Sequence, residues 1–392
     1  MSGAAVRIPR GTCKLFGAIK ALSSLKNCTI LVHGPKGCVY HINYIMGMRG
    51  DRPSEVYSTC LDEHDVIFGA DQKLKNAIGD LDRACHPDLL AVLSCCASDI
   101  IGEDVQSAIR DTTTTAPVIG ISAGGFEGDF RTGYSETLTR LVEEFVTHPG
   151  STDPGSVNLI GLLRGGPDLQ ELVRVLRLAG ITVNTVLTAD ATLEEIRRLG
   201  NAALNIVLCE AAGKEAAIRL QTLCHTPFII EEIPMGCGAT RQFLTRVIGA
   251  LGAGELPDIH EDYGVMDWSP LKNRRIALVS GPTRAISMTR FFAELGIEPR
   301  LVVVDFHSTM NDRLGSLALK TGELLIEPEQ ELILQKLREH HIDLLIGGML
   351  ELSLAKTLGI DHIDIMHGSE RTVGFAGAKN LLNILMRKNA GK

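Results

Sequence analysis

The sequence predicts an α/β fold made of three doubly wound, Rossmann-like domains, with parallel sheets around a central cofactor cleft. Apolar segments of strand length alternate with amphipathic segments along the whole chain, which is the pattern of repeated βαβ units. The composition, 45% hydrophobic and 22% charged residues, is typical of a globular protein with a large core. A length of 392 residues allows two or three domains of ordinary size.

The strand-like segments can be taken in chain order. They are expected at Cys28–His33, Leu89–Leu93, Val157–Leu163, Ile181–Leu187, Ala203–Cys209, Pro227–Ile233, Arg275–Ser280, Arg300–Val304 and Ile342–Ile346. Helical patterns follow two of them, at residues 168–179 and 193–198. Residues 147–156 form a linker rich in Pro, Gly and Ser, and residues 258–272 are a second candidate linker. The domains are therefore predicted at 1–150, 151–268 and 269–392.

Charge and hydropathy exclude several classes of function. The formal net charge is -8, so neither a nucleic acid nor an anionic membrane surface is an expected partner. No run of 18 apolar residues is present, which predicts no membrane-spanning helix, and the first ten residues lack the apolar core of a signal peptide. We therefore expect a cytoplasmic protein, where thiols stay reduced. Metal ligation and simple burial are both open explanations for its ten cysteines.

Three cysteines near the N-terminus lie where a strand ends or a loop begins. They are Cys13, Cys38 at the end of the sequence HGPKGC, and Cys96 in SCCASDIIGED. Thiolates in loops beside glycines suit an iron–sulfur cluster. Three ligands are one short of the usual four, which predicts a cluster shared with a second chain. Cys95 is the adjacent alternative to Cys96, and Cys60 is either an extra ligand or a buried thiol.

The chain contains no Gly-x-x-x-x-Gly-Lys-Ser/Thr motif, so it is not expected to hydrolyse ATP itself. The segment His33–Cys38 is superficially similar but lacks the required spacing. There is also no convincing dinucleotide-binding fingerprint. The turn Ser280–Thr283 follows a strand, but such turns are common without any ligand.

In these motifs the chain resembles the nitrogenase component-1 family. The segments Cys13–Ala18 and His33–Cys38, then Leu61–Ala70, are similar to the first two cluster-cysteine motifs and the stretch after them, and Cys96 stands six residues before Gly102 as in the third motif. The resemblance implies that Cys13, Cys38 and Cys96 bind a P-cluster or a [4Fe–4S] cluster between two related subunits. It also implies a K-like partner in a heterotetramer and an ATP-dependent iron protein as electron donor.

The resemblance extends to the site of a large iron–sulfur cofactor. In the family's catalytic subunit one cysteine and one histidine hold that cofactor, and Cys209 and His367 stand in similar contexts here. Taken alone, Cys209 fits a buried core thiol and His367 fits a hydrogen-bonded loop histidine. Together they imply two ligands of a large iron–sulfur cofactor in a cleft.

The chain departs from dinitrogen-reducing subunits at two places. The loop 125–134 lacks the second histidine of those subunits, and Tyr134 or Ser135 stands near its position. Tyrosine is a poorer proton relay than histidine. We expect Tyr134 and Arg131 to line the substrate pocket as catalytic residues. Glu351 replaces a lysine that holds the organic acid of the molybdenum cofactor. A carboxylate there would repel such an acid. The resemblance therefore implies an iron-only, NifB-co-like cofactor without homocitrate.

The function implied by the resemblance is that of a catalytic, D-like subunit of a nitrogenase-like reductase. Methylthio-alkane reductase, which cleaves carbon–sulfur bonds of a small substrate, fits best within the family. One alternative is a tetrapyrrole reductase subunit, as in bacteriochlorophyll or coenzyme F430 synthesis. Another is a non-catalytic scaffold on which the nitrogenase cofactor matures.

Overall fold

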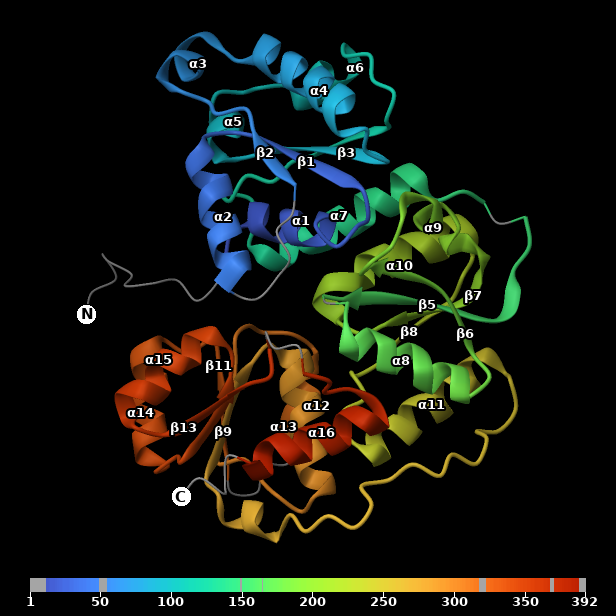
Figure 1. Cartoon of the computed structure of the whole chain (residues 1–392), viewed down its shortest axis with the longest axis vertical. Helices are drawn as coiled ribbons and strands as arrows, with labels where there is room; N and C mark the ends of the chain where they lie inside the picture. The colour runs from blue at the N-terminus through green and yellow to red at the C-terminus, as the bar shows by residue number, and fades with distance from the viewer. Residues whose placement is uncertain are drawn as a thin grey trace. The chain divides into compact units, whose positions relative to one another are not determined.

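The computed structural model describes residues 12–48, 55–148, 150–163, 165–316, 322–366 and 370–387. It confirms the predicted α/β class, because the strands form three parallel sheets with helices between them (Figure 1). None of the described helices combines the length and the apolar character that crossing a membrane requires.

The first sheet has the strand order β2-β1-β3-β4, with every recorded pairing parallel. Its strands are β1 (Cys28–His33), β2 (Val56–Ser58), β3 (Leu89–Ser94) and β4 (Val118–Ile121). Helices α4 and α6 cover one face of the sheet, and α1 and α7 cover the other (Figure 1). The helices of this part are α1 (Lys14–Leu22), α2 (Lys36–Met48), α3 (Glu63–Phe68), α4 (Asp71–Cys85), α5 (Cys96–Ile100), α6 (Val105–Arg110) and α7 (Phe130–Phe145).

The second sheet has the order β6-β5-β7-β8. Its strands are β5 (Asp153–Leu162), β6 (Thr182–Thr188), β7 (Ala202–Val207) and β8 (Phe228–Ile230). The intervening helical elements are α8 (Pro167–Leu178), α9 (Leu193–Arg197), the 3₁₀ turn η1 (Leu199–Asn201) and α10 (Glu210–Cys224), and α11 (Cys237–Leu251) follows β8. The predicted linker at 147–156 therefore ends inside β5, and Cys209 lies two residues beyond β7.

The third sheet has the order β11-β10-β9-β12-β13, again parallel. Its strands are β9 (Ile276–Ser280), β10 (Leu301–Val304), β11 (Glu323–Ile326), β12 (Leu344–Gly347) and β13 (Asp361–Asp364). The helical elements are η2 (Ser269–Asn273), α12 (Pro282–Glu294), α13 (Met310–Ser316), α14 (Gln330–Glu339), α15 (Met349–Leu358) and α16 (Gly374–Arg387). Buried side chains of β9, β10 and β12 pack against α14 and α15.

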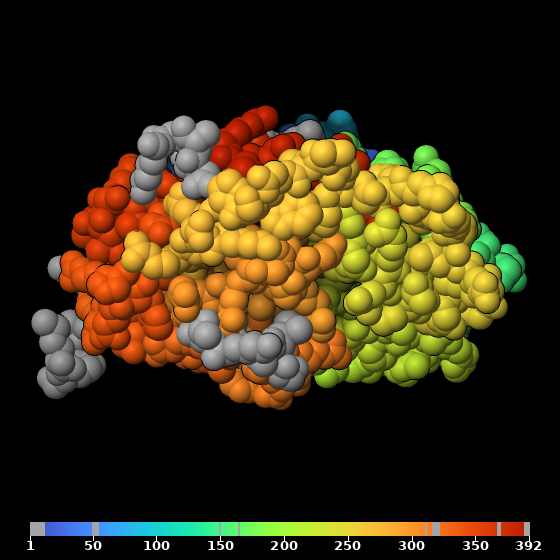
Figure 2. Space-filling model, turned by 90° about the horizontal axis from the view of Figure 1, so that it is seen from below, coloured from blue at the N-terminus to red at the C-terminus, as the bar shows by residue number. Residues whose placement is uncertain are grey.

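The chain groups into two compact units. The first comprises residues 1–163, 184–207 and 211–228, and the second comprises 164–183, 208–210 and 229–392. In the second unit, the irregular segment between α11 and η2 runs over the surface (Figure 2). Tyr263 and Trp268 anchor it, because the Tyr263 hydroxyl donates to Glu294 at 3.0 Å and the Trp268 indole donates to the Leu295 carbonyl at 3.0 Å. The predicted domain boundaries at 150 and 268 and the predicted cleft stay predictions.

Two glycines let α1 and α7 cross at very short range in the first unit. A Cβ atom on Gly133 of α7 would lie 1.9 Å from the carbonyl oxygen of Lys14, and one on Gly17 of α1 would lie 2.0 Å from that of Phe130. Only glycine avoids these backbone collisions. The crossing fixes the start of α1, and Cys13 is the residue immediately before that helix.

Candidate functional site

Four cysteines meet at the carboxyl edge of the first sheet. Strands β1 and β3 are parallel neighbours that end together, since His33 pairs with Ser94. The loop after β1 leads to Cys38 in the first turn of α2, and the loop after β3 holds Cys95 and Cys96. The carboxyl ends of parallel strands are the usual position of ligand sites in α/β proteins.

Contacts show that the thiols share one neighbourhood. The backbone N–H of Gly125, in the loop after β4, donates to the Cys96 sulfur at 3.1 Å. A Cβ atom on Gly125 would lie 3.3 Å from both the Cys96 sulfur and the Cys13 Cβ. Cys38 hydrogen-bonds to Cys95, and the charges of Cys96 and Cys13 also act on it. The structure therefore brings together the three cysteines predicted as ligands and the alternative Cys95.

The turn before Cys38 is also shaped by a glycine. A Cβ atom on Gly34 would lie 2.4 Å from the Cys95 sulfur. Only glycine, which has no side chain, lets the backbone come this close to the thiol. Backbone that lies this close to sulfur suits an iron–sulfur site, where hydrogen bonds to the sulfurs tune the reduction potential.

The hydrogen bond from Cys38 lowers the pKa of the Cys95 thiol to about 6. Burial acts in the opposite direction, and hydrogen bonds from the backbone N–H groups of Ser98 and Ala97 lower the pKa further. The same bond, together with burial, raises the pKa of Cys38. Cys38 is therefore the donor and Cys95 the acceptor of this hydrogen bond between thiols.

A buried cation lies next to Cys13. The side chain of Lys14 is 3% exposed, and its ammonium donates to Glu127 at 2.8 Å and pairs with Glu136 at 2.9 Å. Burial alone would lower the pKa of Lys14, but the bonds to both carboxylates outweigh it and the pKa is raised. Lys14 is thus a buried cation paired with two carboxylates, and it ties the residue after Cys13 to the loop after β4 and to α7.

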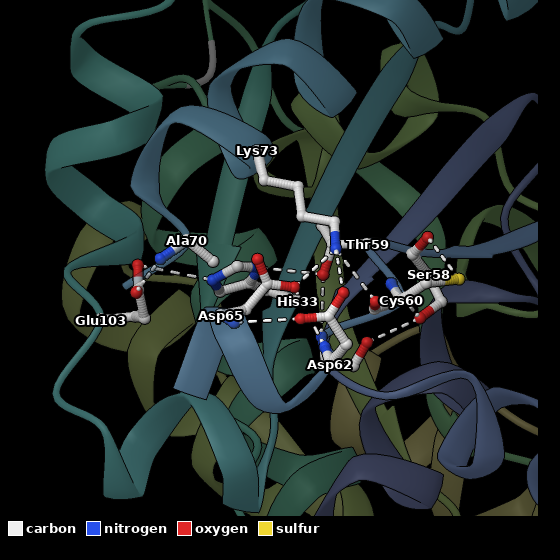
Figure 3. Close-up of polar contacts among 10 residues, drawn as sticks. His33, Ser58, Thr59, Cys60, Asp62, Asp65, Ala70, Lys73 and Glu103 are labelled. Carbon is white, nitrogen blue, oxygen red and sulfur yellow. Dashed lines mark hydrogen bonds and ion pairs between the residues drawn. The ribbon is translucent and has the colours of Figure 1, made fainter. Parts of the chain in front are cut away.

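A polar network braces the loop that carries Cys38 (Figure 3). The fully buried His33 lies 3.0 Å from the Thr59 hydroxyl through Nδ1 and 3.5 Å from Glu103 through Nε2. Burial lowers the pKa of His33, although Glu103 opposes the shift. Thr59 also accepts the Gly34 N–H at 3.1 Å, and the Ser58 hydroxyl donates to the Gly34 carbonyl at 2.7 Å.

The second part of the network holds the loop of Cys60. The Lys73 ammonium donates to Asp65 at 2.5 Å and to the Cys60 carbonyl at 3.1 Å (Figure 3). Cys60 itself is exposed, with a φ of 54°. The reading of Cys60 as a buried thiol is therefore wrong, and its role as an extra ligand stays a prediction.

The cysteines supply the kind of ligand that an iron–sulfur cluster takes. In the described part of the chain, no three His, Cys, Asp or Glu side chains are grouped closely enough to hold one metal ion. A cluster needs thiolate ligands spread around several irons, and Cys13, Cys38 and Cys96 or Cys95 are thiols of that kind.

The two residues predicted to line a substrate pocket both belong to the first turns of α7. Tyr134 is fully buried, with its ring centroid 6.0 Å from that of Phe130. Arg131 is bound through Nε to the carboxylate of Asp129 at 2.8 Å, and Asp129 is the N-cap of α7. Their contact with a substrate stays a prediction.

The second predicted site lies in the second compact unit. Cys209 is half-buried, and the hydroxyl of Thr283, in the first turn of α12, donates to its sulfur at 3.5 Å. Its neighbour Glu210 binds the hydroxyl of Thr309 in the loop after β10. Cys209 therefore lies at the carboxyl edge of the third sheet, next to the segments that follow β9 and β10.

The other predicted cofactor ligand, His367, lies outside the described residues. Glu351, the basis for expecting no homocitrate, is buried in the first turn of α15, where its carboxylate accepts the Gly348 N–H at 2.8 Å. Glu351 thus has a structural role as a helix cap, and its effect on a cofactor stays a prediction.

Sequence reasoning missed several of these residues. Four polar residues hold the segments around the cysteines: Lys14, Thr59, Lys73 and Glu103. Their partners stand between 8 and 113 residues away in the sequence, and no short motif links them. The Asp62 and Asp65 capping box at the start of α3 was a readable local signal.

Comparison with known proteins gives one family match. The family model described as "Nitrogenase component 1 type Oxidoreductase" matches residues 13–388. Among solved structures, the one titled "Nitrogenase Cp1 at pH 6.5" superposes with a TM-score of 0.88 over 100% of this chain and 94% of that chain, at 21% identity. This structural likeness confirms the fold.

Three curated relatives match almost the whole chain at 24–27% identity. The "Nitrogenase iron-molybdenum cofactor biosynthesis protein NifE" of Methanococcus maripaludis is 25% identical over 96% of this chain and 82% of its own length. The protein of the same name from Clostridium pasteurianum is 27% identical over 96% and 86%. The "Nitrogenase molybdenum-iron protein beta chain" of Clostridium pasteurianum is 24% identical over 98% and 94%.

Proposed function

From the premise that the chain belongs to the nitrogenase component 1 type oxidoreductase family, we propose that it is the catalytic, D-like subunit of a nitrogenase-like reductase. It receives electrons from an ATP-dependent iron protein and reduces a small molecule, with carbon–sulfur cleavage of methylthio-alkanes as the reaction. The iron–sulfur groups supply electron storage and transfer when bound.

The observation that carries this proposal is the convergence of Cys13, Cys38 and Cys96 at one sheet edge. Glycines at the two loops leave room for backbone close to sulfur. Thiols grouped in this way are the kind of ligand that an iron–sulfur cluster takes. In this proposal, the cluster is a P-cluster or a [4Fe–4S] cluster.

A partner subunit is supported by the surface next to the cysteines. Large apolar side chains near them in sequence are exposed: Tyr40 by 75%, Ile100 by 70% and Phe126 by 76%. Large exposed apolar side chains in the loops and helices that carry ligand cysteines are typical of interaction surfaces. We assign this face to a related K-like subunit, which would supply the remaining cluster ligands in a heterotetramer.

The second part of the proposal concerns the cofactor. Cys209 and His367 would hold a large iron-only cofactor without homocitrate. Support for Cys209 is its place at the carboxyl edge of the third sheet, with a hydroxyl donor on its sulfur. Arg131 and Tyr134 remain the proposed pocket residues, and the Asp129 carboxylate would keep Arg131 in a fixed orientation.

The test is the iron stoichiometry of the chain purified anaerobically with its partner. The proposal expects many more than four irons per catalytic subunit, and a loss in Cys209→Ala confined to the larger cofactor. A content of about four irons that is unchanged in Cys209→Ala would contradict the proposed large cofactor. It would favour a tetrapyrrole reductase subunit instead.

A second candidate function is a scaffold for cofactor assembly. It is favoured by relatives named as nitrogenase iron-molybdenum cofactor biosynthesis proteins, which match almost the whole chain. A scaffold would give up its large cofactor to an acceptor protein, and a reductase would keep it through turnover. Measuring cofactor iron before and after incubation with a cofactor-free nitrogenase separates the two.

A further inference from the structure

The sulfur of Cys209 has a hydroxyl partner from a distant segment. Thr283 is the second residue of α12, and its Oγ1 donates to the Cys209 Sγ across 3.5 Å. The Thr283 carbonyl in turn accepts the Ser287 hydroxyl at 3.0 Å within the same helix. Thr283 and Cys209 belong to the same compact unit.

The next residue fixes this helical turn from the other side. The Arg284 guanidinium donates to the Thr372 hydroxyl at 3.1 Å and to the Asp168 carboxylate at 3.2 Å. Asp168 also accepts the backbone N–H groups of Thr372 at 2.6 Å and Val373 at 3.1 Å. The side chains of Asp168 and Arg284 are only 13% and 17% exposed. The first turn of α12 is therefore held in place, and Thr283 with it.

In the contact between Thr283 and Cys209, the hydroxyl is the donor and the sulfur is the acceptor. A hydroxyl that donates to a thiolate stabilises negative charge on the sulfur, and hydrogen bonds to sulfur set the reduction potential of iron–sulfur groups. We propose that Thr283 is a positioning residue that orients the Cys209 sulfur and raises the reduction potential of the iron–sulfur group bound there. This inference rests on the proposed function, in which Cys209 is a ligand.

The main experiment compares Thr283→Val, which keeps the side-chain shape but removes the donor, with Thr283→Ser, which keeps the donor. Reduction potentials are measured by paramagnetic resonance on the anaerobic full chain with its partner. A hydrogen bond to a charged group is worth roughly a tenfold change in an equilibrium. For one electron that is about 59 mV. We expect Thr283→Val to lower the potential by about this amount and Thr283→Ser to stay close to the parent protein.

A shape change alone would leave the potential in place, because it does not alter the charge on the sulfur. If Thr283→Val binds its full iron and keeps the parent potential, the proposal is wrong. Thr283→Ala is the second donor-free variant, for use if the valine variant does not fold, and the same result is expected from it.

Failure of the proposed function has a different signature. If Cys209→Ala keeps all its iron, Cys209 is not a ligand. A double-mutant cycle on the metal-free full chain then tests the contact itself. The Tm change caused by Thr283→Val should shrink in the Cys209→Ala background. Equal Tm changes in both backgrounds would overturn the positioning role of Thr283 as well.

Discussion

Replacing Gly133 with alanine should both destabilise the first compact unit and disturb the site of Cys13. The new Cβ would lie 1.9 Å from the Lys14 carbonyl oxygen, about 1.5 Å short of the 3.4 Å at which ordinary contact begins. Because that atom belongs to the backbone, α1 and α7 must move apart. A gap of 0.5–1 Å already costs about a quarter to a half of the dispersion energy of the facing atoms. We expect a loss of about 3 kcal/mol in the free energy of unfolding, the upper end for overpacking.

The assay is urea denaturation followed by circular dichroism, with iron content measured on the same anaerobic samples. Gly47→Ala in α2 is the matched control, because its Cβ would have no atom within 4 Å. Alanine there should stabilise the helix by about 0.5–1 kcal/mol. If Gly133→Ala is as stable as Gly47→Ala and binds as much iron, the argument that this crossing positions Cys13 is wrong.

The remaining predictions concern other parts of the chain. Asp168→Asn should speed amide hydrogen exchange at Thr372 and Val373, because the Asp168 carboxylate accepts hydrogen bonds from both N–H groups. Unchanged exchange rates would contradict the claim that Asp168 holds this segment. Hydrogen bonds from two backbone N–H groups lower the pKa of Asp82, so its stabilisation is present above about pH 4 and is lost as the pH falls through the lowered pKa. The stability difference between Asp82→Asn and the parent protein in urea should therefore be large at pH 7 and small near pH 2, and a constant difference would refute this assignment. The isolated chain with a chemical reductant should not turn over at the rate of the complete system, because it has no ATP-binding loop of its own to drive electron transfer.

The fold could be predicted where strands are buried on both faces. The segment Cys28–His33 is such a strand and was predicted with the observed bounds. The missed strands β2, β4, β11 and β13 are all three or four residues long and lie at sheet edges. Edge strands are half-covered, and Asp361–Asp364 even begins and ends with a carboxylate, so no apolar run marks it.

The candidate site could be predicted only where chemistry is written into short motifs. Short motifs indicated Cys38 and Cys96 as ligands, but the glycine beside the Cys96 sulfur, Gly125, stands 29 residues further along the chain and no local pattern links the two. The partner of Cys209 could not be predicted, because Thr283 stands 74 residues away and a threonine after a strand has many uses. Pairs such as Lys14 and Glu127 likewise depend on how the helices and loops pack.

The central claim is that the cysteines at the carboxyl edge of the first sheet bind an iron–sulfur cluster. The most direct measurement is the absorption and paramagnetic resonance of the anaerobic complex carrying Cys38→Ala, compared with Cys28→Ala. Cys28 is the matched control because it lies at the amino end of β1, whereas Cys38 follows the carboxyl end of that strand, in α2. We predict that Cys38→Ala abolishes the cluster signals and that Cys28→Ala keeps them. Full-intensity signals in Cys38→Ala would contradict the assignment.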